Sequence, residues 1–135
     1  MTKGEIMKRT MIVTFLAVFI AACSMSGGPG KDQIKNALVK DYRDGLQDRV
    51  ESMASLLGEK RAKEGIASAE GTADPAQVNI DPFQAEDIRE IENGDFTAKV
   101  VYTVHQGERF KFDKSERITL TKIQDQWKVI KKESI

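Results

Sequence analysis

Residues 93–107, NGDFTAKVVYTVHQG, decide the fold because apolar side chains recur there at every second position. These positions are Phe96, Ala98, Val100, Tyr102 and Val104. A period of two is typical of a strand that buries one face. Asn-Gly at the start of the stretch is a strong hairpin signal, and Gln-Gly at its end is a second turn. The stretch therefore predicts a strand with an antiparallel neighbour on each side.

The chain before this strand contains two further strand segments. Residues 87–92 precede the Asn-Gly turn directly, so we expect them to form the first arm of the hairpin. Val78 and Ile80 lie between Pro75 and Pro82. Because proline cannot donate to a strand ladder, this segment is predicted to be a short edge strand.

The chain after the second turn predicts two more strands. Residues 108–123 can form one long strand, whose apolar face would carry Phe110, Phe112, Ile118 and Leu120. The middle of this strand, residues 113–117, is polar, which favours a bulge or a bend there. A last turn at residues 124–125 leads into a final strand over residues 126–131.

The chain from Asp32 onward has a helical pattern. Its apolar residues recur three or four positions apart, at Ile34, Leu38, Tyr42, Leu46, Val50, Met53 and Leu57. That spacing places them on one face of a helix. Asp32 can cap the start of the helix. Gly58 either ends the helix or separates it from a second piece over residues 59–64, and residues 65–77 are predicted to be a connection.

Together these segments predict an α+β fold, in which a long N-terminal helix packs on a curved antiparallel meander of about four strands. A helix over residues 34–57 would be about 36 Å long at 1.5 Å per residue. A strand of about ten residues spans about 33 Å. Because the two lengths agree, each element can bury the apolar face of the other.

The N-terminus has the layout of a secretory signal. Basic residues at positions 3, 8 and 9 precede an apolar run over residues 10–22, which ends in small residues. The run is too short for a permanent membrane-spanning helix, which needs about 20 residues. Translation can start at Met1 or at Met7, because the first six residues add nothing that such a signal needs.

The end of the apolar run, Ile20-Ala21-Ala22-Cys23, resembles the lipobox of bacterial lipoproteins. In that family the cysteine thiol is acylated, the signal is cleaved before it, and the cysteine becomes the first residue of the mature protein. Cys23 is the only cysteine of the chain, so no disulfide partner explains it. An ordinary cleaved signal, or a membrane anchor with an unmodified cysteine, is the alternative.

The resemblance divides the chain into a signal peptide over residues 1–22, an acylated Cys23 with a flexible tether up to residue 30, and one α+β domain over residues 31–135. Acyl chains on Cys23 would hold the domain at a membrane, since each buried methylene contributes about 0.8 kcal/mol. The seven tether residues span roughly 15 Å, so the domain would lie close to the lipid. Ser24 follows the cysteine where inner-membrane lipoproteins usually have aspartate, so the resemblance implies the outer membrane.

The charge of the chain after the signal excludes one class of function. Residues 1–22 contain three basic residues and one acidic residue, so 18 basic and 20 acidic residues remain and the net charge is −2. A general nucleic-acid binder would carry a clear basic excess, so we expect no nucleic-acid partner. We also expect no metal or other cofactor, because one histidine and no second cysteine leave only carboxylates as ligands.

Residues 116–133, ERITLTKIQDQWKVIKKE, end in a Trp-Lys-Val strand. With the preceding helix and strands, they make residues 31–133 resemble the cystatin-like and nuclear transport factor 2-like group, which includes many small bacterial lipoproteins of uncharacterised function. The Trp-Lys-Val ending reflects packing of the last strand and implies no reaction. Gln124-Asp125-Gln126 stands where Asp-Gly commonly precedes that tryptophan, so we expect a different turn.

Candidate site residues are few. Enzymes of this fold group place an acid, a histidine or a tyrosine inside the cone, so the resemblance implies Tyr42, Tyr102 and Asp81 as candidates to line a ligand site. Both tyrosines lie on apolar faces, where core packing with a hydrogen-bonded hydroxyl is the usual role. The only histidine, His105, is expected at the surface near a strand end.

Three other features give little indication of function. Cystatins inhibit proteases through a Gln-x-Val-x-Gly hairpin, and Gln-Val at positions 77–78 lacks that spacing. The basic residues within 59–64 are flanked by Glu59 and Glu64 and predict a salt-bridged helix surface. Lys128, Lys131 and Lys132 near the C-terminus either meet anionic headgroups or discourage edge pairing of the last strand.

Three hypotheses about function therefore remain open. The first is a membrane-tethered lipoprotein that acts as a binding or adaptor module for a protein partner or a small apolar ligand. The second is a small cone-fold enzyme of the isomerase or dehydratase kind. The third is a structural subunit of an envelope complex. A concave face filled by the helix would favour a protein partner, and a deep pocket with two or more ionisable groups would favour an enzyme.

Overall fold

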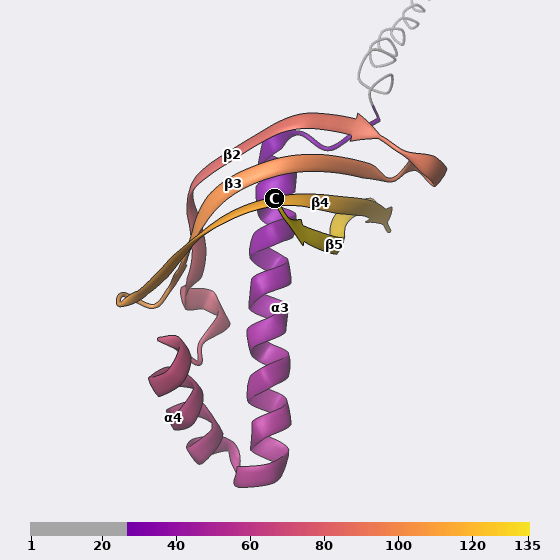
Figure 1. The fold of residues 1–135 in the computed structure, drawn as a ribbon. Helices are drawn as coiled ribbons and strands as arrows, with labels where there is room; N and C mark the ends of the chain where they lie inside the picture. Colours follow the sequence, from indigo (N-terminus) through magenta and orange to yellow (C-terminus); the bar gives the residue numbers. More distant parts are fainter. Residues whose placement is uncertain (1–26) are drawn as a thin grey trace, which may run out of the picture.

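The computed structural model of the protein describes residues 27–135 (Figure 1). Its two main helices are α3 (Lys31–Leu57) and α4 (Glu59–Glu70), and short 3-10 turns lie at η1 (Pro75–Gln77) and η2 (Glu92–Gly94). The strands are β2 (Val78–Glu90), β3 (Phe96–Gln106), β4 (Phe110–Ile123) and β5 (Gln126–Ser134). They form one antiparallel sheet in the order β2-β3-β4-β5. The predicted α+β class, with a helix on a four-stranded meander, is confirmed, and the arrangement is consistent with a cystatin-like fold.

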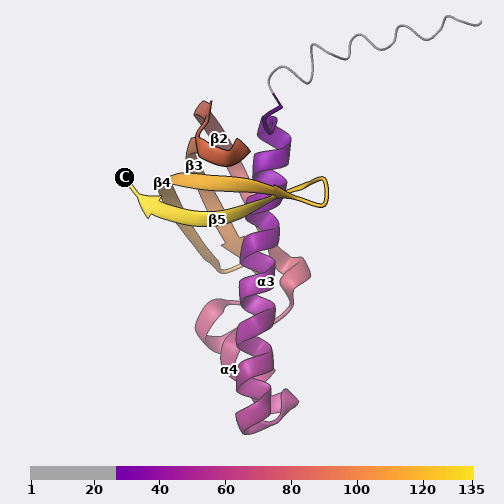
Figure 2. The same ribbon diagram turned by 90° about the vertical axis from the view of Figure 1, so that its right-hand side faces the viewer.

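The sheet bends around only one half of α3. Figure 1 shows the strands curving across the upper part of the helix, while the lower part runs on beyond the sheet beside α4. The view turned by 90° shows the same division, with α4 next to the lower half of α3 (Figure 2). The structure therefore has a sheet-covered half of α3 and a helical hairpin that projects from it.

The core lies between α3 and the concave face of the sheet. Ile34, Leu38 and Leu46 of α3 are completely buried, as are Val100 and Val104 of β3. Burying a side chain of this size contributes about 1.5–3 kcal/mol relative to leaving it exposed. The alternating pattern that predicted β3 is therefore also the pattern that attaches the sheet to the helix.

The first strand differs from its prediction. Residues 78–80 and 87–92 were expected to form two separate strands, but β2 is continuous from Val78 to Glu90. Its register against β3 shifts twice, between Ile80 and Phe83 and between Glu86 and Arg89. Each shift inserts an extra residue, and such bulges bend and twist an edge strand. The sequence pattern breaks at the bulges, which is why it indicated two pieces.

Of the bulge or bend expected in residues 113–117, the bulge is absent. β3 and β4 pair without interruption from Phe96 opposite Leu120 to Gln106 opposite Phe110. The polar residues fit a regular ladder because outward-facing ones find partners across the strands, as Thr103 Oγ1 does with Asp113 Oδ1 at 2.6 Å. The irregularity lies on the other side of β4, between Thr119 and Leu120 in the register with β5.

The last turn also departs from a simple glycine hairpin. Ile123 pairs with Gln126, so Gln124 and Asp125 alone connect β4 to β5. Both adopt positive φ, 52° for Gln124 and 65° for Asp125. Positive φ at both central positions matches the twist of the flanking strands. This two-residue turn therefore forms although neither residue is glycine.

The helical region is longer than its prediction at both ends. α4 includes residues 65–70, which were expected to be a connection, because Ala62 and Ile66 bury one face against its surroundings. At the other end α3 starts at Lys31, where Gln33 Oε1 accepts from the backbone N–H of Gly30 at 2.8 Å. The N-cap residue is therefore Gly30, held by the side chain of Gln33, and not Asp32.

Candidate functional site

Tyr42 and Tyr102, the two tyrosines that the sequence singled out, meet at the interface between helix and sheet. Their hydroxyl oxygens lie 2.9 Å apart. Tyr102 projects from the buried face of β3 and is 1% exposed, whereas Tyr42 on α3 is half-buried. The two rings pack edge to face with their centroids 6.2 Å apart. The structure thus brings together two residues that are 60 positions apart in the chain.

A buried carboxylate completes this pair. The hydroxyl of Tyr102 donates to Glu116 Oε1 at 2.6 Å, and Glu116 is only 5% exposed. Lys114 Nζ lies 3.9 Å from the other oxygen of Glu116. Sequence reasoning missed Glu116, because it treated residues 113–117 as a polar break. The sequence did indicate its burial, because Glu116 lies two and four positions before Ile118 and Leu120 and therefore shares their side of β4.

Lys132 closes the other end of the network. Its Nζ lies 2.8 Å from Asp41 Oδ2 on α3 and 4.3 Å from the ring centroid of Tyr42. A cation over an aromatic face is attracted by the negative face of the ring. Lys132 had been expected either to face lipid headgroups or to discourage edge pairing. In the structure it ties β5 to the helix.

The protonation of the network is fixed by burial and by these contacts. Burial raises the pKa of Tyr102, and the hydrogen bonds with Glu116 and Tyr42 raise it further. Burial also raises the pKa of Tyr42, against the opposing effects of Tyr102 and Lys132. Burial alone would lower the pKa of Lys132, but Asp41 and Tyr42 outweigh it, so this pKa is raised. At neutral pH both tyrosines are therefore protonated and the lysine is charged, which suits a structural clasp.

The remaining predicted candidates lie elsewhere. Asp81 is exposed at the first bulge of β2, and its carbonyl oxygen accepts from His105 Nε2 at 2.8 Å. His105 is half-buried near the end of β3, on the opposite face from Tyr102. Within residues 27–135, no three His, Cys, Asp or Glu side chains are grouped to hold a metal ion. Cys23 and the lipobox residues Ile20, Ala21 and Ala22 lie outside the described residues.

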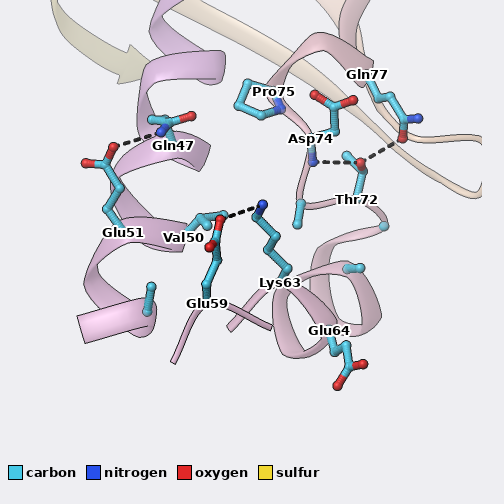
Figure 3. A pocket seen from close by; sticks show the side chains of 14 residues that line it. Gln47, Val50, Glu51, Glu59, Lys63, Glu64, Thr72, Asp74, Pro75 and Gln77 are labelled. Carbon is cyan, nitrogen blue, oxygen red and sulfur yellow. Dashed lines mark hydrogen bonds and ion pairs between the residues drawn. The ribbon is translucent and has the colours of Figure 1, made fainter. Parts of the chain in front are cut away.

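A wide groove lies between α3 and α4. We call it the hairpin groove, and it measures about 950 Å³ (Figure 3). Its lining comes from the segment 71–77 and from one face of each helix, namely Gln47, Val50, Glu51 and Ala54 of α3 and Glu59, Lys63, Glu64 and Ala67 of α4. Its small or apolar lining residues, which we call the floor, are Val50, Ala54, Ala67 and Ala73, whereas Pro75 lies in the upper wall. Neither Tyr42 nor Tyr102 lines it.

Hydrogen bonds along the rim hold the walls of the hairpin groove in place. Gln47 Nε2 donates to Glu51 Oε2 at 2.7 Å, and Thr72 Oγ1 donates to Gln77 Oε1 at 2.7 Å (Figure 3). Where α4 ends, Gly71 has φ +95° and a Cβ there would collide with the carbonyl oxygen of Gln106. The segment that forms the upper wall is therefore fixed by a close approach to the sheet.

A second hollow lies on the other face of the same two helices. It measures about 510 Å³, and we call it the back groove; Met53, Gly65, Ile66 and Ala69 give it an apolar lining. Arg49 and Glu70 border it and form a two-pronged ion pair between the helices, with N–O distances of 2.6 and 2.9 Å. The helical hairpin therefore has two faces, each hollowed, and they differ in polarity.

No family model matches the chain, and no curated protein or solved structure shows significant similarity to it. In the part of the chain that the structure describes, no helix has the length and apolar character needed to cross a membrane.

Proposed function

We propose that the protein is a membrane-tethered envelope lipoprotein, which acts as a binding or adaptor module and holds a protein partner in the hairpin groove. One observation carries this proposal. The concave face of the sheet is filled by the apolar stripe of α3, whereas the lower half of α3 and α4 leave a groove of about 950 Å³ open at the surface. Open grooves between helices are common sites of recognition.

The tyrosine network supports a partner over a reaction or a small apolar ligand at the concave face. Both hydroxyls are engaged, Tyr102 with Glu116 and Tyr42 with Tyr102. A general base needs a lowered or matched pKa, and both tyrosines have raised pKa values. The network therefore serves better to fasten the sheet to the helix than to move a proton.

The lipid anchor is part of the proposal, and the start of the fold is compatible with it. Gly28 packs so closely on Phe96 that a Cβ would lie 2.5 Å from that ring, and Pro29 is buried. The proposed tether between Cys23 and the fold would then comprise only residues 24–27. α3, with 27 residues, runs about 40 Å away from that point, so the hairpin groove would lie at the end remote from Cys23.

The anchor is tested by intact-mass measurement of the full-length protein extracted from bacterial membranes. We expect a chain that starts at Cys23 and carries the added mass of acyl groups, and a Cys23→Ala variant that keeps residues 1–22 because cleavage follows acylation. An unmodified Cys23 in the wild-type chain would exclude the anchor. Ser24 favours the outer membrane, so the acylated chain should separate with that membrane on a density gradient.

The groove is tested by photo-crosslinking in cells that make the full-length protein. A photoreactive residue at position 67 lies in the hairpin groove, and one at position 101 lies on the outer face of the sheet, where Val101 is 46% exposed. We expect a discrete adduct from position 67 that disappears when Ala54→Arg fills the groove, and none from position 101. Equal adducts at both positions, or none at position 67, would contradict the proposal.

A further inference from the structure

The rim of the hairpin groove carries a marked negative charge. Among its lining residues are four carboxylates, Glu51, Glu59, Glu64 and Asp74, and a single cation, Lys63, so the lining has a net charge of −3. Lys63 lies 2.9 Å from Glu59 and is already paired with it. The carboxylates of Glu51, Glu64 and Asp74 are exposed and have no cation of this chain within the lining.

These carboxylates surround an apolar floor. Figure 3 shows Glu51 and Glu64 at opposite sides of the groove, with their carboxylates directed outward, and Asp74 beside Pro75 at its upper wall. The floor between them consists of Val50 and of alanines, whose short side chains leave room for a guest side chain. The groove therefore combines an apolar lining with acidic residues at its edges.

The back groove shows that this charge is a property of one face and not of the whole hairpin. Its charged lining residues are Asp48, Arg49 and Glu70, and the last two neutralise each other in a two-pronged ion pair. The same two helices thus present an acidic groove on one side and a nearly neutral one on the other. The chain as a whole has a net charge of 0.

We propose that the hairpin groove takes a segment of a partner protein in which an apolar side chain is flanked by lysine or arginine. This inference rests on the proposed function, because it names the chemistry of the partner for the same groove. The apolar side chain would occupy the floor, and the flanking cations would meet the carboxylates of Glu51, Glu64 and Asp74, which no cation of the lining pairs. Charge complementarity of this kind steers association and selects against acidic segments.

The charge on the rim makes salt dependence a direct consequence. Exposed charges more than about 10 Å apart are largely screened at 0.1 M salt. Binding of a cationic segment should therefore weaken as the salt concentration rises, whereas a contact made only by the apolar floor should not.

Two synthetic peptides of equal length and known composition test the inference. In one, a single leucine is flanked by lysines, and in the other the same leucine is flanked by glutamates. Binding to the full-length protein in a non-ionic detergent is measured by fluorescence anisotropy at about 50 mM and about 300 mM salt. We expect binding of the lysine peptide only, and at least a threefold weaker affinity at the higher salt.

Three variants locate the binding. Ala67→Arg fills the hairpin groove and should weaken the affinity for the lysine peptide at least tenfold. Ala69→Arg, two residues away in the back groove, should change that affinity less than twofold. Combined Glu51→Gln, Glu64→Gln and Asp74→Asn should remove most of the salt dependence without changing the thermal unfolding midpoint. All these positions are exposed, so each variant is expected to fold.

The outcomes separate the inference from the proposed function. If both peptides bind equally and Ala67→Arg abolishes both, the groove binds segments but the charge preference is wrong. If neither peptide binds, or if Ala67→Arg and Ala69→Arg have equal effects, the cationic-segment inference is wrong. Photo-crosslinking at position 67 then decides independently whether the groove has a partner at all.

Discussion

The two halves of α3 share one spacing of apolar residues but have different environments. In the first half, residues 31–46, the apolar stripe is covered by the sheet, and Ile34, Leu38 and Leu46 are fully buried. In the second half, residues 47–57, the same spacing continues through Val50, but Leu57 is 47% exposed and the neighbouring Leu56 is 80% exposed. The apolar residues of the first half therefore belong to the core, whereas those at the end of the second half lie at the surface.

The difference comes from what covers each half. The sheet brings large side chains to the first half, including Tyr102 and Val104. The second half is covered by α4 and the short segment 71–77, and the buried residues of α4 are only Ala62 and Ile66. Small side chains fill less volume, so hollows remain on both faces of the hairpin. Stability is thus concentrated at the sheet end, and open surface at the hairpin end.

A leucine-to-alanine pair should separate the two halves most strongly. Leu38→Ala removes a fully buried side chain and should lower the free energy of unfolding by about 2–5 kcal/mol. Leu56→Ala, in the exposed half, should change it by less than about 0.5 kcal/mol. Urea unfolding of the full-length protein measures both. Losses of similar size would mean that the hairpin end is packed as tightly as the sheet end.

Removing one hydroxyl should show how the sheet end is fastened. Tyr102→Phe leaves the buried Glu116 without its donor and should cost about 1–3 kcal/mol of unfolding free energy. Tyr42→Phe should cost less, because that hydroxyl is nearer to water. Adding Glu116→Met to Tyr102→Phe should recover part of the loss, since no buried polar group is then left unpaired. A double variant less stable than Tyr102→Phe alone would contradict this reading of the network.

Alkaline pH should weaken the same network. In the fold the pKa values of both tyrosines are raised above the ordinary 10.0. Above pH 10 the unfolded chain therefore loses tyrosine protons that the folded chain keeps, so stability falls as the pH rises. The raised pKa of Lys132 acts in the same direction. The slope should approach roughly 1.4 kcal/mol per pH unit for each group.

Absorbance provides a check on this pH dependence. The chain has only two tyrosines, so the ultraviolet signal of tyrosinate reports on Tyr42 and Tyr102 alone. Tyrosinate should form together with unfolding, and Tyr102→Phe should flatten the loss of stability above pH 10. Tyrosinate that forms well before unfolding would mean that the hydroxyls are accessible to solvent in the folded protein.

The smallest expected effect concerns the two glycines of the hairpin end. Gly65 lies within α4 and a Cβ there would meet nothing within 4 Å, so Gly65→Ala should raise stability by about 0.4–1 kcal/mol. Gly71 has φ +95° and no room for a Cβ, so Gly71→Ala should instead lower the thermal unfolding midpoint. If Gly65→Ala destabilised the protein, the back groove would have to be narrower than it is in the structure.

The periodic parts of the sequence predicted most of the fold, and the aperiodic parts did not. The alternation from Phe96 to Val104 and the helical spacing from Ile34 to Val50 gave β3 and α3 directly, because burial of one face imposes those periods. The bulges of β2 were missed because an inserted residue breaks the period that identifies a strand. Residues 65–70 of α4 were missed because small side chains carry little hydrophobic pattern.

The candidate site was predictable only in part. The sequence identified Tyr42 and Tyr102, since both fall on apolar faces, but their contact depends on how α3 crosses the sheet. The position of Glu116, two residues before Ile118, places it on the buried face of β4, but its contact with Tyr102 depends on the register of β4 against β3. The hairpin groove could not be predicted, because its walls come from three segments whose arrangement depends on the packing of α4 against α3.

Hydrogen exchange along α3 tests most directly whether the sheet end holds the fold while the hairpin end stays open for a partner. Amides in residues 34–46 of the full-length protein should exchange only through global unfolding. Amides in residues 50–57 and 62–70 should exchange at least tenfold faster, which corresponds to about 1.4 kcal/mol less protection. Equal protection along the whole of α3 and α4 would contradict the division of the molecule into a structural end and a binding end.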